Sequence, residues 1–306
     1  MGRRPRHHRG AHICDQRLVR RARRARHQHL RASFDQNVRS MTAPLHQLAH
    51  EVIGDGPHPL VFVHGFTQTR TSWRTVAQAV VAGVPASRAM LIDLPGHGES
   101  QQVAADIAES ARLVTECGGQ ATYIGYSLGA RVVLHALINQ PNAVQRAAVI
   151  SGTAGLVTAA ERDERVAADE LLAQRIEAIG VEAFVDEWLA LPLFADVPLA
   201  ANQRRERLTN TAQGLATSLR RCGQGTQTPL WNQLAQISTP LLAIAGSLDA
   251  KYVAHARRLA TTAPQATLRI IPDAGHATHL VAPQLVADEI IHWITNPTAY
   301  STPTTS

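Results

Sequence analysis

Short apolar segments bounded by glycine and proline alternate with longer segments of helical period along most of the chain. Apolar, β-branched runs of this length predict buried strands, and the segments between them carry apolar residues at the spacing of one helical face. The predicted strands are residues 60–63, 90–93, 121–125, 147–151, 241–245 and 268–271. The predicted helices are residues 73–81, 103–117, 128–139, 252–262 and 284–295. This alternation is typical of a mostly parallel, doubly wound α/β sheet.

The alternation stops between residue 152 and about residue 236. Charged segments of helical period replace it, at residues 160–179, 181–191 and 203–221. Open α/β sheets bind ligands at the carboxyl edge of their strands, so a helical insertion here predicts a cap over that edge. The expected organisation is a core of residues 41–151 and 237–296, a helical cap of residues 152–236, and a flexible tail of residues 297–306.

Charge is distributed unevenly along the 306 residues, whose formal net charge is +6. Residues 1–40 hold twelve arginines and two aspartates, whereas residues 41–306 hold 18 basic and 22 acidic side chains. Residues 41–306 are therefore mildly acidic, and their charge does not indicate a nucleic-acid partner. The first 40 residues are expected to be a disordered basic leader or an extension upstream of a true start at Met41. The alternative is an arginine-rich segment that binds nucleic acid or anionic lipid or directs transit to an organelle.

The sequence lacks the signals of several classes of protein. There is no apolar region of secretory length at the N-terminus, and no run approaches the roughly 18 apolar residues of a membrane span. Cys14, Cys117 and Cys222 are widely spaced and form no metal-ligand pattern. A P-loop, a glycine-rich dinucleotide turn and an HExxH motif are also missing from the sequence. We expect a cytoplasmic protein without a cofactor or metal, and the sequence leaves its oligomeric state open.

The stretch GYSLGAR at residues 125–131 lies between a predicted strand and a predicted helix. In the Gly-x-Ser-x-Gly elbow, small residues let strand and helix approach while a sharp turn lifts the serine oxygen above the sheet edge. This context predicts that Ser127 is a nucleophile or base; the alternative is an ordinary turn serine. The helix N-terminus that follows favours negative charge beside it.

A serine elbow requires three further parts, and each has a candidate in the expected place. Asp249 follows the strand at 241–245, and His276 follows the last strand, in the chain order serine, aspartate, histidine. The loop VFVHGF at residues 61–66 predicts that the backbone N–H of Phe66 joins that of Leu128 in an oxyanion hole.

Other residues could fill these roles or explain these motifs. Asp249 could instead cap the helix that follows it. Asp273 and Asp93 are rival acids, although Asp93 precedes the serine in chain order. His279 and His64 are rival histidines. The simpler interpretation of His279 is a residue at the surface or behind the catalytic residues, and that of His64 is a residue that packs the loop.

These motifs resemble the α/β-hydrolase superfamily over residues 45–295. Within it, the chain is most similar to the 2-succinyl-6-hydroxy-2,4-cyclohexadiene-1-carboxylate synthases of menaquinone biosynthesis. The resemblance rests on VFVHGFTQTRTSW, DLPGHGES, GYSLGARV, AERDERVAADELLAQRI, EWLALPLF, GSLDAKY and AGHATH. It implies an enzyme that abstracts a proton from a cyclohexene and eliminates pyruvate, with the triad serine acting as a base.

The resemblance also implies a set of substrate-binding residues for several carboxylates. Arg131, one helical turn after Ser127, and Arg165 match family arginines, while Tyr126 and Trp188 match aromatic pocket positions. Each could instead be an ordinary surface or core residue.

One family arginine has no counterpart. Thr209 or Thr211 aligns near its position, and Arg207 could reach the pocket in a different register.

This departure leaves the substrate open. The alternative enzyme reading is a serine hydrolase, a carboxylesterase or thioesterase, acting on a carboxylate-bearing ester. A non-enzymatic binding protein on the same scaffold is disfavoured because all three triad residue types are present. The partner expected in every enzyme reading is a small carboxylated molecule.

Overall fold

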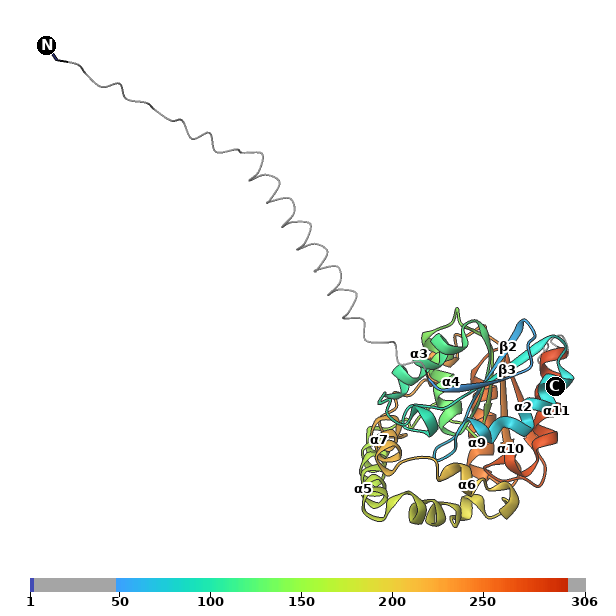
Figure 1. Ribbon diagram of the computed structural model, residues 1–306. Helices are drawn as coiled ribbons and strands as arrows, with labels where there is room; N and C mark the ends of the chain where they lie inside the picture. The colour runs from blue at the N-terminus through green and yellow to red at the C-terminus, as the bar shows by residue number, and fades with distance from the viewer. Residues whose placement is uncertain (3–47, 297–306) are drawn as a thin grey trace. The chain divides into compact units, whose positions relative to one another are not determined.

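The fold is built on one sheet of seven strands in the order β1-β3-β2-β4-β5-β6-β7, in which only β1 runs antiparallel to its neighbour (Figure 1). The computed structural model describes residues 1–2 and 48–296, so almost all of the predicted leader and the whole predicted tail lie outside the described residues. The strands are β1 His50–Ile53, β2 His58–Val63, β3 Ser87–Ile92, β4 Ala121–Tyr126, β5 Val144–Ile150, β6 Leu241–Gly246 and β7 Ala266–Ile271. This sheet confirms the predicted α/β class.

Helices cover both faces of the sheet (Figure 1). They are α2 Arg74–Gly83, α3 Ile107–Gly118, α4 Leu128–Asn139, α8 Trp231–Leu234, α9 Ala250–Thr262, α10 Thr278–Val281 and α11 Pro283–Thr295. Alternate residues of β2 serve different faces, because Val61 and Val63 belong to the core beneath α3, α4 and α9, whereas Leu60 and Phe62 belong to the core beneath α2 and α11. Both faces of the sheet are therefore buried, as in other parallel sheets.

The predicted elements differ from the observed ones mainly at their ends. The edge strand β1 was not predicted, because its four residues alternate between exposed and half-buried positions and form no apolar run. The helix predicted from residue 103 begins at Ile107, because the Asp106 carboxylate caps it by accepting a hydrogen bond from the Glu109 N–H (2.9 Å).

Between β5 and β6 the described elements are all helical: α5 Ala159–Leu189, η3 Pro192–Phe194, η4 Leu199–Ala201, α6 Arg204–Arg207, α7 Ala212–Cys222 and α8. We call residues 152–236 the insertion. Helix α5 begins with a capping box between Thr158 and Glu161 and is interrupted at Gly180, whose φ of 78° lies in the left-handed region. Helices α5 and α7 pack together around Ile176, Phe184 and other residues of a separate small core.

The single helix predicted at residues 203–221 is wrong. The chain leaves the helical path after Leu208, and α7 starts again at Ala212 because the Thr211 hydroxyl accepts the Gly214 N–H (3.2 Å). The side chain of Asn210, in the break, is bonded to two loops of the core as well as to the carbonyl oxygen of Arg207 at the end of α6. Long-range hydrogen bonds therefore override the helical propensity of this segment.

A buried histidine in α4 gives the fold a dependence on pH. His135 is 4% exposed, and neither of its ring nitrogens has a hydrogen-bond partner among the described residues. Burial, with a smaller contribution from Arg131, lowers the pKa of His135 to about 4. The imidazole is therefore neutral in the folded protein at a pH at which the unfolded chain is protonated.

We predict that His135→Leu reduces the loss of stability in mild acid. Since the unfolded pKa is about 6.5, the unfolded state binds the additional proton between about pH 6.5 and pH 4, and stability falls as the pH falls. One such group contributes up to about 1.4 kcal/mol per pH unit. Urea unfolding at about pH 7.5 and about pH 5 measures this difference. The control is His58→Gln, at an exposed histidine; an unchanged pH dependence in His135→Leu would contradict the prediction.

Candidate active site

Ser127 occupies a sharp turn between β4 and α4. Its φ of 51° and ψ of −105° are unusual for a residue with a side chain, and strain of this kind is common at functional sites. The turn is possible because two glycines flank it. A Cβ on Gly125 would lie 2.3 Å from the carbonyl oxygen of Gly129, and a Cβ on Gly129 would lie 2.1 Å from that of Val63. The motif thus has a steric reason for both glycines, as in a nucleophile elbow.

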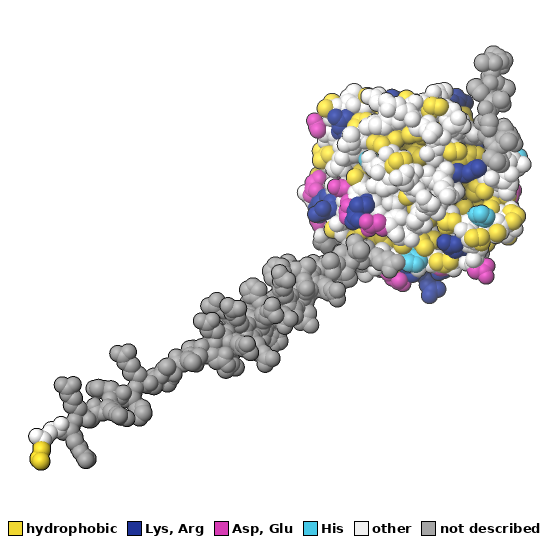
Figure 2. Space-filling model, turned by 90° about the horizontal axis from the view of Figure 1, so that it is seen from above, with side chains coloured by type: hydrophobic (Ala, Val, Ile, Leu, Met, Phe, Trp, Pro, Cys, Tyr) yellow, Lys and Arg dark blue, Asp and Glu magenta, His cyan; other side chains and the backbone are white. Residues whose placement is uncertain are grey.

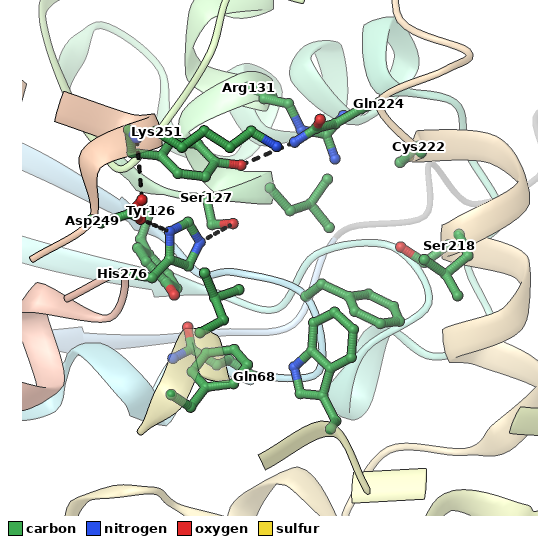
Figure 3. Close-up of a pocket in the computed structure, with 18 of the residues that line it drawn as sticks. Gln68, Tyr126, Ser127, Arg131, Ser218, Cys222, Gln224, Asp249, Lys251 and His276 are labelled. Carbon is green, nitrogen blue, oxygen red and sulfur yellow. Dashed lines mark hydrogen bonds and ion pairs between the residues drawn. The ribbon is translucent and has the colours of Figure 1, made fainter. Parts of the chain in front are cut away.

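The structure brings Ser127, His276 and Asp249 into one hydrogen-bonded line (Figure 3). His276 Nε2 lies 3.1 Å from Ser127 Oγ, and His276 Nδ1 lies 2.8 Å from Asp249 Oδ2. Asp249 follows β6, and its second oxygen accepts the N–H of Tyr252 at 3.2 Å. This geometry lets His276 take a proton from Ser127 while Asp249 orients the ring.

The charge on Asp249 is held by its partners. Burial would raise its pKa, but the hydrogen bond and charge of His276 outweigh that effect, so the pKa of Asp249 lies below its ordinary value. The carboxylate is therefore ionised at neutral pH and can stabilise a protonated His276. Asp249 also caps α9, so its two possible roles coexist.

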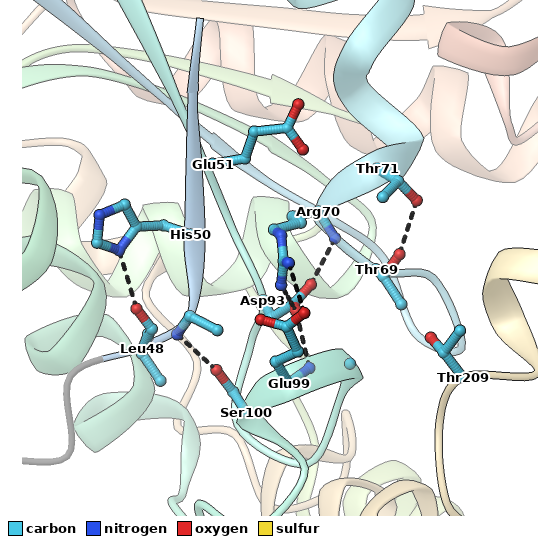
Figure 4. A network of polar contacts seen from close by, with 12 residues as sticks. Leu48, His50, Glu51, Thr69, Arg70, Thr71, Asp93, Glu99, Ser100 and Thr209 are labelled. Carbon is cyan, nitrogen blue, oxygen red and sulfur yellow. Dashed lines mark hydrogen bonds and ion pairs between the residues drawn. The ribbon is translucent and has the colours of Figure 1, made fainter.

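Asp93 and the rival histidines are engaged elsewhere, and Asp273, the other rival acid, is exposed. Asp93 is 1% exposed and accepts the backbone N–H groups of Arg70 (2.7 Å) and Glu99 (2.9 Å), in addition to the Arg70 guanidinium (Figure 4). It organises the loop at residues 93–100. Among the rival histidines, His64 Nε2 accepts the Leu94 N–H (3.0 Å), and His279 Nε2 lies 3.1 Å from Gln68 Nε2.

Phe66 and Leu128 are the two residues expected to supply backbone N–H groups to an oxyanion hole. Phe66 and Leu128 both line the cavity that contains Ser127. The neighbouring Gly65 N–H is already bonded to Gln68 Oε1 (3.0 Å), whereas no hydrogen bond from the N–H of Phe66 or Leu128 occurs among the described residues. These two groups are therefore the available donors of an oxyanion hole.

A cavity of about 330 Å³ opens above Ser127 and is lined from both the core and the insertion. Its basic lining residues are Arg131, Arg165, Arg207 and Lys251, and its only acidic lining residue, among those described, is Asp249. Asp249 is paired with His276. Of the four cations, only Arg165 forms an ion pair with a described residue, Asp169, so Arg131, Arg207 and Lys251 keep their charge unpaired. Such a cavity favours an anionic ligand.

The three cavity arginines differ in how they are held. Arg165 pairs with Asp169 (2.8 Å), whereas Arg131 donates to the amide oxygen of Gln227 (3.3 Å) and forms no ion pair with a described residue. Burial lowers the pKa of Arg131, and lowers that of Arg207 to about 10. Both remain cations at neutral pH, so their buried charge is available to a carboxylate.

Arginines on the outer surface of the insertion have different partners from the arginines in the cavity. Three arginines of the insertion outside the cavity pair with carboxylates: Arg204 with Asp186 (2.6 Å), Arg220 with Glu177 (2.6 Å), and Arg175 with Glu187 (2.5 Å). Elsewhere, on the face of the molecule that is seen from above Figure 1, some basic and acidic side chains also lie beside one another (Figure 2). Arg131 and Arg207 differ from these residues because they are buried and form no ion pair with a described residue.

Aromatic rings form the walls around the triad. The Tyr126 ring lies 5.3 Å from the His276 ring, and the Trp188 ring, from α5, lies 5.3 Å from that of Phe66. Burial raises the pKa of Tyr126, so its hydroxyl stays protonated and can donate a hydrogen bond. The walls limit access of water to the triad.

A family model described as the alpha/beta hydrolase family matches residues 60–289. The chain belongs to this family. A 2-succinyl-6-hydroxy-2,4-cyclohexadiene-1-carboxylate synthase of Serratia proteamaculans (strain 568) is 32% identical over 80% of this chain and 96% of its own length. The Klebsiella pneumoniae enzyme of that name is 33% identical over 74% of this chain and 90% of its own. The solved structure of MenH from S. aureus has 27% identity and a TM-score of 0.75, over 80% and 97% of the two chains.

The family match is accompanied by two further observations on the described residues. No group of three or more His, Cys, Asp or Glu side chains in residues 1–2 and 48–296 is arranged to hold a metal ion. No helix in the same ranges is long and apolar enough to span a membrane.

Several cavity residues were not predicted as part of the site. They are Gln68, Leu193, Phe194, Ser218, Leu219, Cys222, Gly223, Gln224, Lys251 and Tyr252. Lys251 and Tyr252 lie two and three residues after Asp249, so their position in GSLDAKY was a usable signal. The sequence contained no such signal for Gln224. Its side-chain amide accepts a hydrogen bond from Arg165 (3.3 Å) and donates one to Tyr252 (3.0 Å), and both partners are distant in the sequence.

We predict that Gly129→Ala destabilises the protein by about 3 kcal/mol, the upper end for overpacking, since the new Cβ would meet a backbone carbonyl that cannot rotate away. Ser127→Ala is the matched variant in the same turn, and its free energy of unfolding should stay within about 0.5 kcal/mol of wild type. Urea unfolding compares the two. Equal stability of Gly129→Ala and wild type would contradict the steric account.

Proposed function

We propose that this protein is a lyase of the 2-succinyl-6-hydroxy-2,4-cyclohexadiene-1-carboxylate synthase type, which eliminates pyruvate from a carboxylated cyclohexene. The observation that carries the proposal is a serine–histidine–aspartate line beneath a cavity with four basic side chains and one acid, which is already paired. The Serratia and Klebsiella relatives bear that enzyme name, and they support the same reaction here.

In the proposed reaction Ser127 acts as a base. His276 takes the hydroxyl proton of Ser127 as Ser127 Oγ removes a proton from a ring carbon of the substrate. The electron pair of that C–H bond forms the new ring double bond, and the C–O bond to the leaving group breaks. Pyruvate leaves as its enolate. The enolate then accepts a proton from the protonated His276. The N–H groups of Phe66 and Leu128 would stabilise the oxygen that becomes negative.

Three arginines would bind the substrate carboxylates. Arg131 and Arg165 were expected in this role, and Arg207, which is 1% exposed, supplies a third guanidinium in the cavity lining. Thr209, near the position of the missing family arginine, instead bonds its hydroxyl to the carbonyl oxygen of Glu206 (2.7 Å). In our proposal Arg207 takes over the function of that arginine.

The insertion acts as a cap domain in this proposal. It supplies Arg165, Trp188 and Arg207 to the cavity, whereas the core supplies the triad. Tyr126 and Trp188 would hold the substrate ring between aromatic surfaces, which excludes water while the carbanion is present. A site shared between two segments can change its substrate without changing its proton-transfer residues.

The second candidate is hydrolysis of a carboxylate-bearing ester or thioester. It is supported by the same elbow geometry, because Ser127 would attack a carbonyl carbon if one came within reach of Oγ. The pocket cations suit both reactions, and only the chemistry at carbon distinguishes them.

We predict rapid pyruvate release from the enzymatically prepared cyclohexene substrate and negligible cleavage of a p-nitrophenyl ester panel. Ser127→Ala and His276→Ala should each lower kcat by at least about a thousandfold, because the proton relay is broken. Pyruvate is followed with lactate dehydrogenase, and circular dichroism checks folding. Ester cleavage without pyruvate release would favour the hydrolase, and wild-type turnover in either variant would reject the triad.

We also predict that Arg131→Met raises KM for the carboxylated substrate about 10- to 100-fold, since one charge-assisted pair contributes about 1.5 to 3 kcal/mol. Methionine keeps the apolar stem and removes only the guanidinium. The control is Arg175→Met, whose side chain is exposed and paired with Glu187 (2.5 Å) on the surface of the insertion. Steady-state kinetics decides, and a KM equal to that of wild type would exclude Arg131 from the binding site.

A further inference from the structure

The loop that supplies Phe66 continues into a strained residue. Thr67 is fully buried and has a φ of 66°, in the left-handed region that a β-branched residue strongly disfavours. Such a conformation persists only when surrounding contacts hold it in place. The contacts of Thr67 therefore indicate what sets the shape of this loop.

Two residues of the insertion hold Thr67. The Arg207 guanidinium donates to Thr67 Oγ1, and Asn210 Nδ2 donates to the Thr67 carbonyl oxygen at 2.7 Å. The sequence separations are 140 and 143 residues. Both the side chain and the backbone of the strained residue are thus bonded to a segment outside the core.

Asn210 also reaches a second core loop. Its Oδ1 accepts the N–H of Gly98 (2.8 Å), and its Nδ2 additionally donates to the Arg207 carbonyl oxygen (2.9 Å). The side chain is buried, at 3% exposure, so its amide has no alternative partners in water. Because donor and acceptor ends are both used, the amide cannot turn over without losing bonds at both loops.

These bonds act directly on the oxyanion donor. Phe66 lies between Gly65 and Thr67. On one side, the Gly65 N–H donates to Gln68 Oε1 (3.0 Å) and its carbonyl oxygen accepts from His64 Nδ1 (2.8 Å). On the other side, the insertion holds the hydroxyl and the carbonyl oxygen of Thr67, while the Gln68 N–H donates to the Gly65 carbonyl oxygen (3.2 Å) and closes the turn that contains Phe66 and Thr67. The Phe66 N–H lies in the same planar peptide as the Gly65 carbonyl, which the core holds. The bonds to Thr67 fix the other end of the same turn, so both sets of contacts restrict the direction of the Phe66 N–H.

We propose that Asn210 and Thr67 are positioning residues that set the oxyanion hole from the insertion. The cap thereby does more than bind substrate, because docking of residues 207–210 on the core completes the arrangement of the Phe66 N–H. The inference rests on the proposed use of Ser127 and Phe66 as reacting and stabilising groups, but not on the identity of the substrate. It assigns a role in kcat to residues that need not touch the substrate.

The test uses a small, uncharged fluorophosphonate, whose reaction with Ser127 requires the triad and the oxyanion hole but no cavity arginine. We expect Asn210→Asp to lower the second-order rate of Ser127 phosphonylation about tenfold or more, since a carboxylate would face the Thr67 carbonyl oxygen. Gln213→Glu is the matched control, an amide-to-acid change at an exposed residue of the insertion. It should react at the wild-type rate. Intact-protein mass spectrometry follows the label.

A second pair of variants separates the bond to Thr67 from damage to the fold. Thr67→Val keeps the shape and branching of the side chain but loses the hydroxyl, and it should also be labelled about tenfold more slowly. Thr67→Ser keeps the hydroxyl and should restore most of the rate. With the carboxylated substrate, Asn210→Asp should lower kcat and leave KM within about twofold. A merely structural defect would lower the amount of active enzyme and leave the labelling rate of the active fraction unchanged.

Each outcome decides the question. Wild-type labelling rates in Asn210→Asp and Thr67→Val, or a wild-type enzyme whose Ser127 takes up no label, would overturn the inference. Slow labelling in both variants together with absent pyruvate release in wild type would instead retain the positioning role and reject the proposed reaction.

Discussion

The site depends on the absence of a side chain at Gly129. A Cβ there would lie 2.1 Å from the Val63 carbonyl oxygen, so helix α4 can approach the end of β2 only because the residue is glycine. That approach places Ser127 beside residues 64–66, which follow β2 and include the candidate oxyanion donor Phe66. The same approach directs the N-terminus of α4 at the cavity, where its partial positive charge favours developing negative charge.

The charged groups that react and the charged groups that bind differ in whether they have a partner of opposite charge within the protein. The Asp249 carboxylate is committed to His276, so it contributes a fixed charge to proton transfer and neutralises none of the cavity arginines. Arg131 and Arg207 are buried without an ion pair among the described residues, which is costly unless a ligand supplies the missing charge. A binding site can tolerate this unfavourable free energy, because a bound carboxylate offsets it by pairing with the buried guanidinium.

The insertion is joined to the core at the loops that carry the reacting groups. Arg207 and Asn210 bond to Thr67, Asn210 bonds to Gly98, and the Asp196 carboxylate accepts the Gly275 N–H next to His276. The sheet determines where Ser127, Asp249 and His276 stand, because each follows a strand. The insertion determines the pocket and holds the loops, so a change in its sequence can alter binding and, in our proposal, rate.

The sequence by itself determined the features that depend on local pattern. Apolar runs located six of the seven strands, and glycine spacing located the elbow, because steric requirements at a tight turn act on neighbouring residues. The order of Ser127, Asp249 and His276 along the chain followed from their places after strands.

The tertiary structure alone decided what depends on contacts between distant residues. The edge strand β1, with half-exposed residues, has no apolar run, and the break at residues 208–211 results from hydrogen bonds between Asn210 and the core. Likewise, Gln68 and His279 are 211 residues apart, and Arg207 enters the cavity through a change of backbone direction that no local periodicity reveals. Local sequence patterns record propensity and burial; they do not record which distant partner a buried polar group will find.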